Sequence, residues 1–136
     1  MVAGLVQWQD GYLLARNVSW PPGVFSLLTG FLEEGEPPEA AVAREVREEL
    51  GVTTQSVDFV GHFPLPRFNQ LIIAYALRTT GALALGEEIS EVKVLSLIEL
   101  AGFDFGPLEL TRDVVSCWLR KLATPRSEQR DAPHGV

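Results

Sequence analysis

The stretch GFLEEGEPPEAAVAREVREELGV, residues 30–52, decides how the rest of this sequence is interpreted. Pro37 and Pro38 suit the entrance of a helix, where a missing backbone N–H costs nothing. The residues that follow are mostly good helix formers, and Gly51 suits a left-handed cap at the end of a helix. The sequence therefore predicts a helix that begins at these prolines and ends before Gly51.

Three glutamates on this helix, Glu45, Glu48 and Glu49, stand at i, i+3 and i+4. Side chains at these spacings are neighbours on a helix, and like charges there repel each other. The apolar residues of the stretch form one arc that can face a sheet, namely Val42, Val46 and Leu50. At about 100° per residue, the glutamates occupy the arc beside this apolar face and not the arc opposite it.

Two interpretations of the glutamates are open at this point. They can be an exposed charged face, held together by i,i+4 ion pairs such as Arg44 with Glu48. Alternatively, their oxygens converge on a divalent cation, because oxygen ligands suit Mg²⁺ and Mn²⁺ and a cation would relieve the repulsion. The spacing of the glutamates does not by itself decide between a solvated face and a metal site.

Composition narrows the class of protein. The chain has 136 residues, of which 18 are acidic and 11 basic, giving a formal net charge of -7. A chain of this size suits one domain, and its acidity argues against binding to a nucleic-acid backbone, which needs cationic surface. We see no transmembrane run and no signal-peptide pattern, so no membrane partner and a cytoplasmic location are expected. The single cysteine, Cys117, lies in an apolar run and is expected in the core.

Strand-like runs occur on both sides of the central helix, at 3–8, 11–16, 25–32, 55–63, 70–78 and 91–97. Residues 64–68 are predicted to form a loop because their prolines cannot donate to a strand ladder, and residues 81–90 to form a turn or loop. Helical spacing returns over 106–123, and both Trp8 and Trp118 are expected in the core. We predict an α/β sandwich with a mixed sheet over 1–123, followed by a disordered tail, 124–136.

The spacing of the fixed residues resembles the Nudix box, G-x5-E-x7-R-E-U-x-E-E-x-G-U with U aliphatic. Every fixed position is filled, by Gly30, Glu36, Arg44, Glu45, Val46, Glu48, Glu49, Gly51 and Val52. The resemblance implies a Nudix-type α/β/α sandwich that hydrolyses a nucleoside diphosphate linked to another group, X. It also implies Mg²⁺ or Mn²⁺ as the cofactor and a small nucleotide as the substrate.

The resemblance assigns roles to individual residues. Glu45 and Glu49 would be the main metal ligands, and Glu48 would be a ligand or would orient or deprotonate the attacking water. Arg44 would position these glutamates through ion pairing, with Glu36 as its partner. The carbonyl of Thr29 would be a further ligand, and Gly30 would provide permissive backbone geometry.

The residues outside the box bear on the identity of X. Residues 26–36 are similar to the corresponding stretch of NADH pyrophosphatases, and Pro64 and Pro66 match two prolines of that subfamily's downstream motif S-Q-P-W-P-F-P-x-S. The rest of the motif is not matched, and one cysteine cannot form the subfamily's four-cysteine zinc ribbon. Candidate substrate-binding residues are Trp20, Phe63, Pro64, Arg67, Phe68 and Gln70. NADH or ADP-ribose is therefore the expected substrate.

A further acidic ligand is expected from residues 87–91. Similarity to the NADH pyrophosphatases places Glu88 at that position, with Glu87 and Glu91 as alternatives. His62 is not expected to be catalytic. The alternative function is a nucleotide-sensing module without turnover, while RNA-cap removal fits poorly with the net charge. Many Nudix domains dimerise, so a homodimer is considered, although no segment of the sequence indicates an interface.

Overall fold

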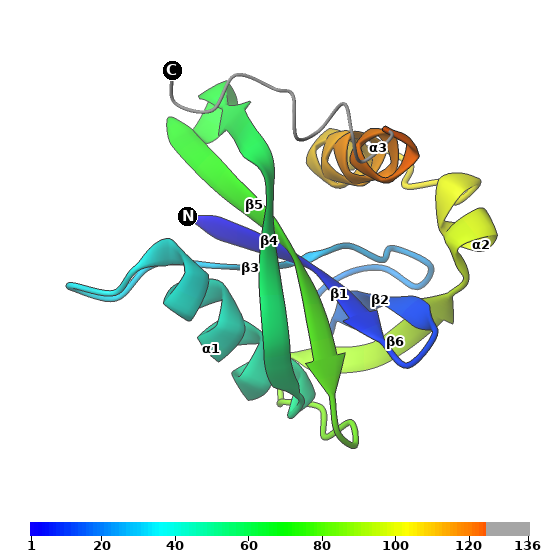
Figure 1. The fold of residues 1–136 in the computed structure, drawn as a ribbon, viewed down its shortest axis with the longest axis horizontal. Coiled ribbons are helices and arrows are strands. Elements are labelled where there is room, and N and C mark those ends of the chain that lie inside the picture. Colours follow the sequence, from blue (N-terminus) through cyan, green and yellow to red (C-terminus); the bar gives the residue numbers. More distant parts are fainter. Residues whose placement is uncertain (125–136) are drawn as a thin grey trace.

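The computed structural model describes residues 1–124, so the predicted tail, apart from Thr124, lies outside the described residues. It has a six-stranded mixed sheet in the order β4-β5-β1-β2-β6, with β3 paired to one end of β1. Helix α1 covers one face of the sheet, and α2 and α3 lie on the other side (Figure 1). The predicted α/β/α sandwich with a mixed sheet is therefore confirmed. The elements are β1 (Val2–Trp8), β2 (Gly11–Asn17), β3 (Leu28–Gly30), α1 (Pro38–Leu50), β4 (Thr53–Leu65), a 3₁₀ turn (Pro66–Phe68), β5 (Gln70–Thr80), β6 (Ile89–Leu95), α2 (Leu97–Ala101) and α3 (Glu109–Ala123).

Strand β5 shows how the sheet divides the core in two. Side chains alternate between the faces of a strand, so Ile72 and Ala74 pack in the α3 layer while Tyr75 and Leu77 pack in the α1 layer. Strand β5 runs parallel to β1 at the centre of the sheet and antiparallel to β4. Because the central strands are covered on both faces, the sheet is a firm base for α1.

The short strand β3 places the start of the Nudix box against the sheet. Gly30 pairs with Val2 of β1, and Leu28 pairs with Gly4, in antiparallel register. The predicted strand over 25–32 is shorter in the structure, although Ser26 also forms an isolated bridge with Ala15. The consequence is that residues 29 and 30 are fixed beside the helix that carries the glutamates.

Strand β4 corrects the prediction of a loop over 64–68. Pro64 belongs to the strand and lies opposite Leu71, and only Pro66–Phe68 leaves it as a 3₁₀ turn. The prediction failed because proline is excluded from central strands but tolerated on edge strands, and β4 has β5 as its only neighbour. The predicted turn over 81–90 ends at Gly86–Glu88, because β6 begins at Ile89.

Helix α2 was not predicted, and the position of Cys117 is also corrected. Ser96 and Glu99 form a reciprocal capping box around the first turn of α2, a signal that S-x-x-E in the sequence carries. Cys117 is only half-buried, with its thiol directed at the carbonyl oxygen of Val60, 3.4 Å away. Trp118 is buried as predicted, while Trp8 packs half-buried against the α1 layer. Over residues 1–124, no helix is long and apolar enough to span a bilayer.

Candidate metal site and adjoining pockets

Helix α1 presents its glutamates beside its buried face. Val42, Val46 and Leu50 are at most 1% exposed, so they fix the rotation of the helix on the sheet. The helix begins after Pro37 and ends at Gly51, whose φ of 75° gives the predicted left-handed cap. With this rotation fixed, the glutamates flank the core instead of pointing straight out into solvent.

Arg44 is the centre of an ion-pair network. Its Nε and Nη2 donate to the two carboxylate oxygens of Glu36 at 2.8 and 2.9 Å, and Nη2 also donates to the carbonyl oxygen of Phe31 at 3.0 Å. Its Nη1 donates to Oε1 of Glu45 at 3.1 Å and reaches Oε2 of Glu48 at 3.3 Å. Hydrogen bonds from Arg44 lower the pKa of Glu36 to about 2. The guanidinium thereby joins the loop before α1 to the glutamates on it.

Gly30 lies in close contact with Glu45. A Cβ built at Gly30 would overlap the carboxyl group of Glu45, so no larger residue fits without moving that side chain. Burial is the main cause that raises the pKa of Glu45 above its ordinary value, and the hydrogen bond from Arg44 opposes this shift. The absence of a side chain at Gly30 thus leaves room for a carboxylate next to β3.

Glu49 carries the least satisfied carboxylate of the site. Its Oε2 is buried and has no hydrogen-bond partner among residues 1–124. Burial raises the pKa of Glu49, and the negative charges of Glu88, Glu45 and Glu48 raise it further. An unpartnered buried carboxylate oxygen is costly. The arrangement is therefore one in which a cation would be stabilising.

The loop between β5 and β6 is docked on the end of α1. The backbone N–H groups of Ala84 and Gly86 donate to the carbonyl oxygens of Leu50 and Glu49, at 2.8 and 2.9 Å. This docking brings Glu88 into a pocket of about 60 Å³ that Glu49 also lines. Pockets that hold small organic ligands usually have volumes of about 300–1,000 Å³, so this pocket alone is too small to enclose a nucleotide.

The alternatives to Glu88 lie elsewhere. Glu91 is bound to Nε of Arg16 at 2.8 Å, and Glu87 does not line the small pocket. The small pocket is completed by Thr29 and the half-buried Trp20, together with residues that the sequence did not single out: Ala15, Asn17, Leu27, Leu28 and Ile89.

The glutamates are not gathered around one point in this conformation. Among residues 1–124, no three His, Cys, Asp or Glu side chains are grouped so that they could hold a metal ion as they stand. Glu45 and Glu48 are turned toward Arg44 instead. In this conformation Arg44 therefore offsets part of the repulsion that the spacing of the glutamates creates.

The predicted substrate-binding residues fall into two places. Trp20 lines the small pocket with Glu49, whereas Phe63, Pro64, Arg67 and Phe68 line a second pocket of about 560 Å³ between the β4–β5 hairpin and the start of α3. The exposed Gln70 lines neither pocket. The second pocket also contains residues that sequence analysis missed, among them Ser26, Glu109, Leu110, Thr111 and Asp113.

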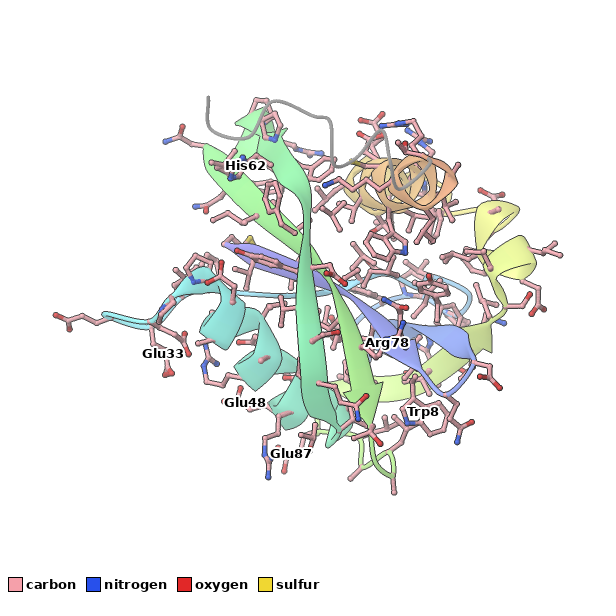
Figure 2. All side chains as sticks on the ribbon, viewed as in Figure 1. Trp8, Glu33, Glu48, His62, Arg78 and Glu87 are labelled. Atoms are coloured by element: carbon pink, nitrogen blue, oxygen red, sulfur yellow. The ribbon has the colours of Figure 1, made fainter. Side chains whose placement is uncertain are left out.

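The missed residues come from the start of α3 and from the segment before β3. Hydroxyl groups of Ser26 and Thr111 are hydrogen-bonded at 2.6 Å, which ties α3 to that segment. Glu109 and Asp113 are one helical turn apart, and this i,i+4 pair of acids was the only signal in the sequence. Figure 2 shows His62 on the β4–β5 hairpin, well away from Glu48 on α1.

The comparisons with known proteins identify the family. A family model described as "NUDIX domain" matches residues 1–119, and the chain therefore belongs to the Nudix family. The "NAD-capped RNA hydrolase NudC" of Mycobacterium bovis is 46% identical over 66 residues, which are 48% of this chain and 21% of that protein. The protein of the same name from Pseudomonas aeruginosa is 47% identical over 64 residues, 46% of this chain and 23% of that protein. The chain thus matches less than a quarter of the length of these relatives.

Solved structures agree with the fold over more of the chain. The Escherichia coli ORF135 protein has a TM-score of 0.71 at 22% identity, covering 92% of this chain and 91% of that one. The MutT protein of Methanosarcina mazei has a TM-score of 0.70 at 26% identity, covering 90% and 94%. An Ap4A hydrolase from Caenorhabditis elegans has a TM-score of 0.69 at 16% identity, covering 90% and 97%. The recognised family and fold class are confirmed.

Proposed function

We propose that the chain is a divalent-metal-dependent pyrophosphohydrolase that cleaves a nucleoside diphosphate linked to a second group, with NADH, a related dinucleotide, or ADP-ribose as its substrate. The observation that carries this proposal is the buried, unpartnered Oε2 of Glu49, surrounded by the charges of Glu45, Glu48 and Glu88. A stable fold does not need this arrangement, because each of these charges makes the next one harder to ionise. A bound cation would remove the penalty.

The residues present fit Mg²⁺ or Mn²⁺. Glu49, Glu88 and Thr29 line the small pocket, so two carboxylates and the carbonyl of Thr29 would supply oxygen ligands there, and Glu45 would add a third carboxylate. Ligation requires the carboxylate of Glu45, and that of Glu48 where it takes part, to turn from Arg44 toward Glu49. When bound, the ion neutralises the diphosphate and lowers the pKa of the attacking water.

The chain's own residues supply positioning and proton transfer. Glu48 is 54% exposed and paired with Arg44, so its carboxylate would accept a proton from the attacking water after it turns away from Arg44. Arg44 holds the loop before α1 through Glu36 and the carbonyl of Phe31, and Gly30 leaves space for the carboxylate of Glu45. Because phosphoryl transfer depends mainly on positioning and charge stabilisation, the fixed rotation of α1 is itself part of the mechanism.

The larger pocket suits a ring of the substrate. Its volume of about 560 Å³ lies within the range of small-molecule sites. Phe63 and Phe68 offer faces for stacking, and Arg67 offers a guanidinium for phosphate. Glu109 and Asp113 at its rim accept hydrogen bonds, which favours an amino or carboxamide group such as adenine and nicotinamide carry.

A second candidate substrate is the NAD cap of an RNA, because two relatives that match part of this chain are named NAD-capped RNA hydrolases. The net charge of -7 favours the free dinucleotide over a long RNA, since a phosphate backbone would meet an acidic surface. A nucleotide sensor without turnover is favoured by one observation, the engagement of Glu45 and Glu48 with Arg44.

A substrate panel tests the proposal. NADH, NAD⁺, ADP-ribose, diadenosine polyphosphates, nucleoside triphosphates and NAD-capped RNA are incubated with Mg²⁺, with Mn²⁺ and with chelator, and the products are separated by chromatography. We expect two mononucleotide products from NADH, or AMP and ribose phosphate from ADP-ribose, only with metal. Tight ADP-ribose binding without any cleavage supports the sensor instead, and cleavage that persists in chelator refutes the proposed chemistry.

A further inference from the structure

Strand β6 leaves an open edge on the sheet. In the part of the chain that the structure describes, β6 pairs only with β2 and lies at the end of the strand order, with α2 following it (Figure 1). An exposed edge strand presents unpaired N–H and C=O groups and is a template for another strand. The edge of β6 can either be blocked by other groups or be available to pair with another strand.

The other edge, β4, is blocked by several devices. It contains Pro64 and two irregularities in its register. Two side chains of α3 also donate to its backbone carbonyl oxygens. The thiol of Cys117 donates to the carbonyl of Val60, and the ammonium of Lys121 donates to that of Phe59. Over Ser90–Leu95, β6 has no such cover in the part of the chain that the structure describes.

The sequence of β6 is self-complementary in charge. If Val92 faces the same residue of a second antiparallel strand, Glu91 faces Lys93 and Ser90 faces Val94. Glu91 and Lys93 lie on the same face of the sheet because strand side chains alternate, and Lys93 stands over the ring of Phe25 on the α3 side. The register therefore places Glu91 of each copy opposite Lys93 of the other, in addition to the ion pair that Glu91 forms with Arg16 of its own chain, and it juxtaposes no like charges.

Exposed apolar side chains gather around the same edge. Val94, Leu97 and Ile98 are 45%, 46% and 85% exposed. Val18 and Leu85, at the opposite end of β6, are also exposed, and Val18 is hydrogen-bonded through its N–H to the carbonyl of Glu88. Apolar groups gathered at an unpaired strand edge are typical of an interaction surface.

We propose that β6 is a homodimer interface, in which two copies pair antiparallel about Val92 and join their sheets into one. A second copy is the partner that the charges select, because the strand complements itself and a two-fold axis satisfies both ion pairs at once. This proposal is independent of the proposed function, because its test measures the oligomeric state of the protein and not its enzymatic activity.

Sedimentation equilibrium over a concentration series tests the interface. The wild-type chain is expected to dimerise reversibly. Lys93→Glu and Glu91→Lys each place like charges opposite each other, so each variant alone is expected to weaken the dimer by roughly tenfold or more. An equimolar mixture of the two variants restores opposite charges at both pairs and is expected to recover the dimer. Asp58→Lys, on the β4 edge, is the matched control and is expected to dimerise like wild type.

A covalent trap gives a second measurement that does not depend on these variants. In a Cys117→Ser background, Val92→Cys places one thiol opposite its own copy, so mild oxidation is expected to double the mass on a non-reducing gel. Asp58→Cys in the same background is expected to stay at the monomer mass. A wild-type chain that stays monomeric throughout the series, or a mixture of the charge variants that stays dissociated, overturns the proposal.

Discussion

The backbone N–H of Gly86 donates to the carbonyl oxygen of Glu49 at 2.9 Å, so the loop that carries Glu88 is fastened to the end of the helix that carries the other glutamates. A Cβ at Gly86 would lie 2.8 Å from the carbonyl oxygen of Glu48 and 3.3 Å from Oε2 of Glu49. The distance between the loop and the helix is therefore set by the absence of one side chain. This contact defines the geometry of the site as much as the spacing within the Nudix box does.

Gly86→Ala is expected to push the loop away from α1 and to lower kcat by roughly 10- to 100-fold, because misplacing a catalytic group by about 1 Å has effects of that size. Gly102→Ala is the matched control, since the nearest atom to its added Cβ is 3.8 Å away. Steady-state kinetics and thermal melting measure both variants. Equal kinetics in the two would show that the loop does not position the site.

Glu49→Gln is expected to keep the fold and to lower kcat by roughly 10²- to 10⁴-fold, because it removes a carboxylate charge from the proposed metal site. Glu34→Gln is the control, as it is an exposed change in the loop before α1. Circular dichroism and turnover on the best substrate of the panel report the two effects. Turnover near that of wild type in Glu49→Gln, with metal present, would remove this residue from the mechanism.

Single substitutions of the three loop glutamates to glutamine should identify the fourth acidic ligand. Glu88→Gln is expected to raise the Mn²⁺ concentration needed for half-maximal activity by about tenfold or more, because Glu88 alone of the three lines the pocket with Glu49. Glu87→Gln and Glu91→Gln are expected to resemble wild type. If the shift appears in Glu91→Gln instead, the register of this loop must differ from the structure.

Arg44→Lys tests whether the shape of the guanidinium matters or only its charge. Lysine cannot donate to both carboxylate oxygens of Glu36 and to the carbonyl of Phe31 together, so the loop before α1 is held less firmly and kcat is expected to fall about 10- to 100-fold. The exposed Arg47 provides the control, Arg47→Lys. Unchanged kinetics in Arg44→Lys would reduce the role of Arg44 to that of a nearby positive charge.

The bond between Arg44 and Glu36 predicts a pH dependence of stability. Its hydrogen bonds lower the pKa of Glu36 from 4.5 to about 2. A depressed carboxyl pKa contributes stability that is present above the unfolded value and lost as pH falls through the folded value. The difference in melting temperature between wild type and Glu36→Gln is therefore expected to be largest above pH 4.5 and to shrink toward pH 2. A difference that does not change over this range would contradict the pairing.

The spacing of residues within α1 was enough to predict the helix, its caps and its buried face. These features depend on neighbours along the chain, such as Pro38 at the start and Gly51 at the end. The short helix α2 was missed because five residues carry little periodicity, although its capping pair, Ser96 and Glu99, was legible. The length of β4 was misjudged because a sequence does not reveal which strands lie at an edge.

The pockets depend on contacts between distant parts of the chain. Ser26 and Thr111 are hydrogen-bonded although 85 residues separate them in the sequence. No pattern among neighbouring residues predicts this contact. The split between Trp20 and Phe63 follows from the layers of the fold, because the two residues line separate pockets. Glu88 is preferred to Glu91 as the candidate ligand because Glu91 forms an ion pair with Arg16 on the neighbouring strand β2.

Anomalous diffraction from crystals soaked in Mn²⁺ tests the central claim most directly. We expect one strong peak about 2.0–2.3 Å from carboxylate oxygens of Glu49 and Glu45, beside the carbonyl of Thr29 and within reach of Glu88. The side chain of Glu45 should then have turned away from Arg44. Crystals that show no peak at these glutamates, even with ADP-ribose bound in the larger pocket, would contradict the account.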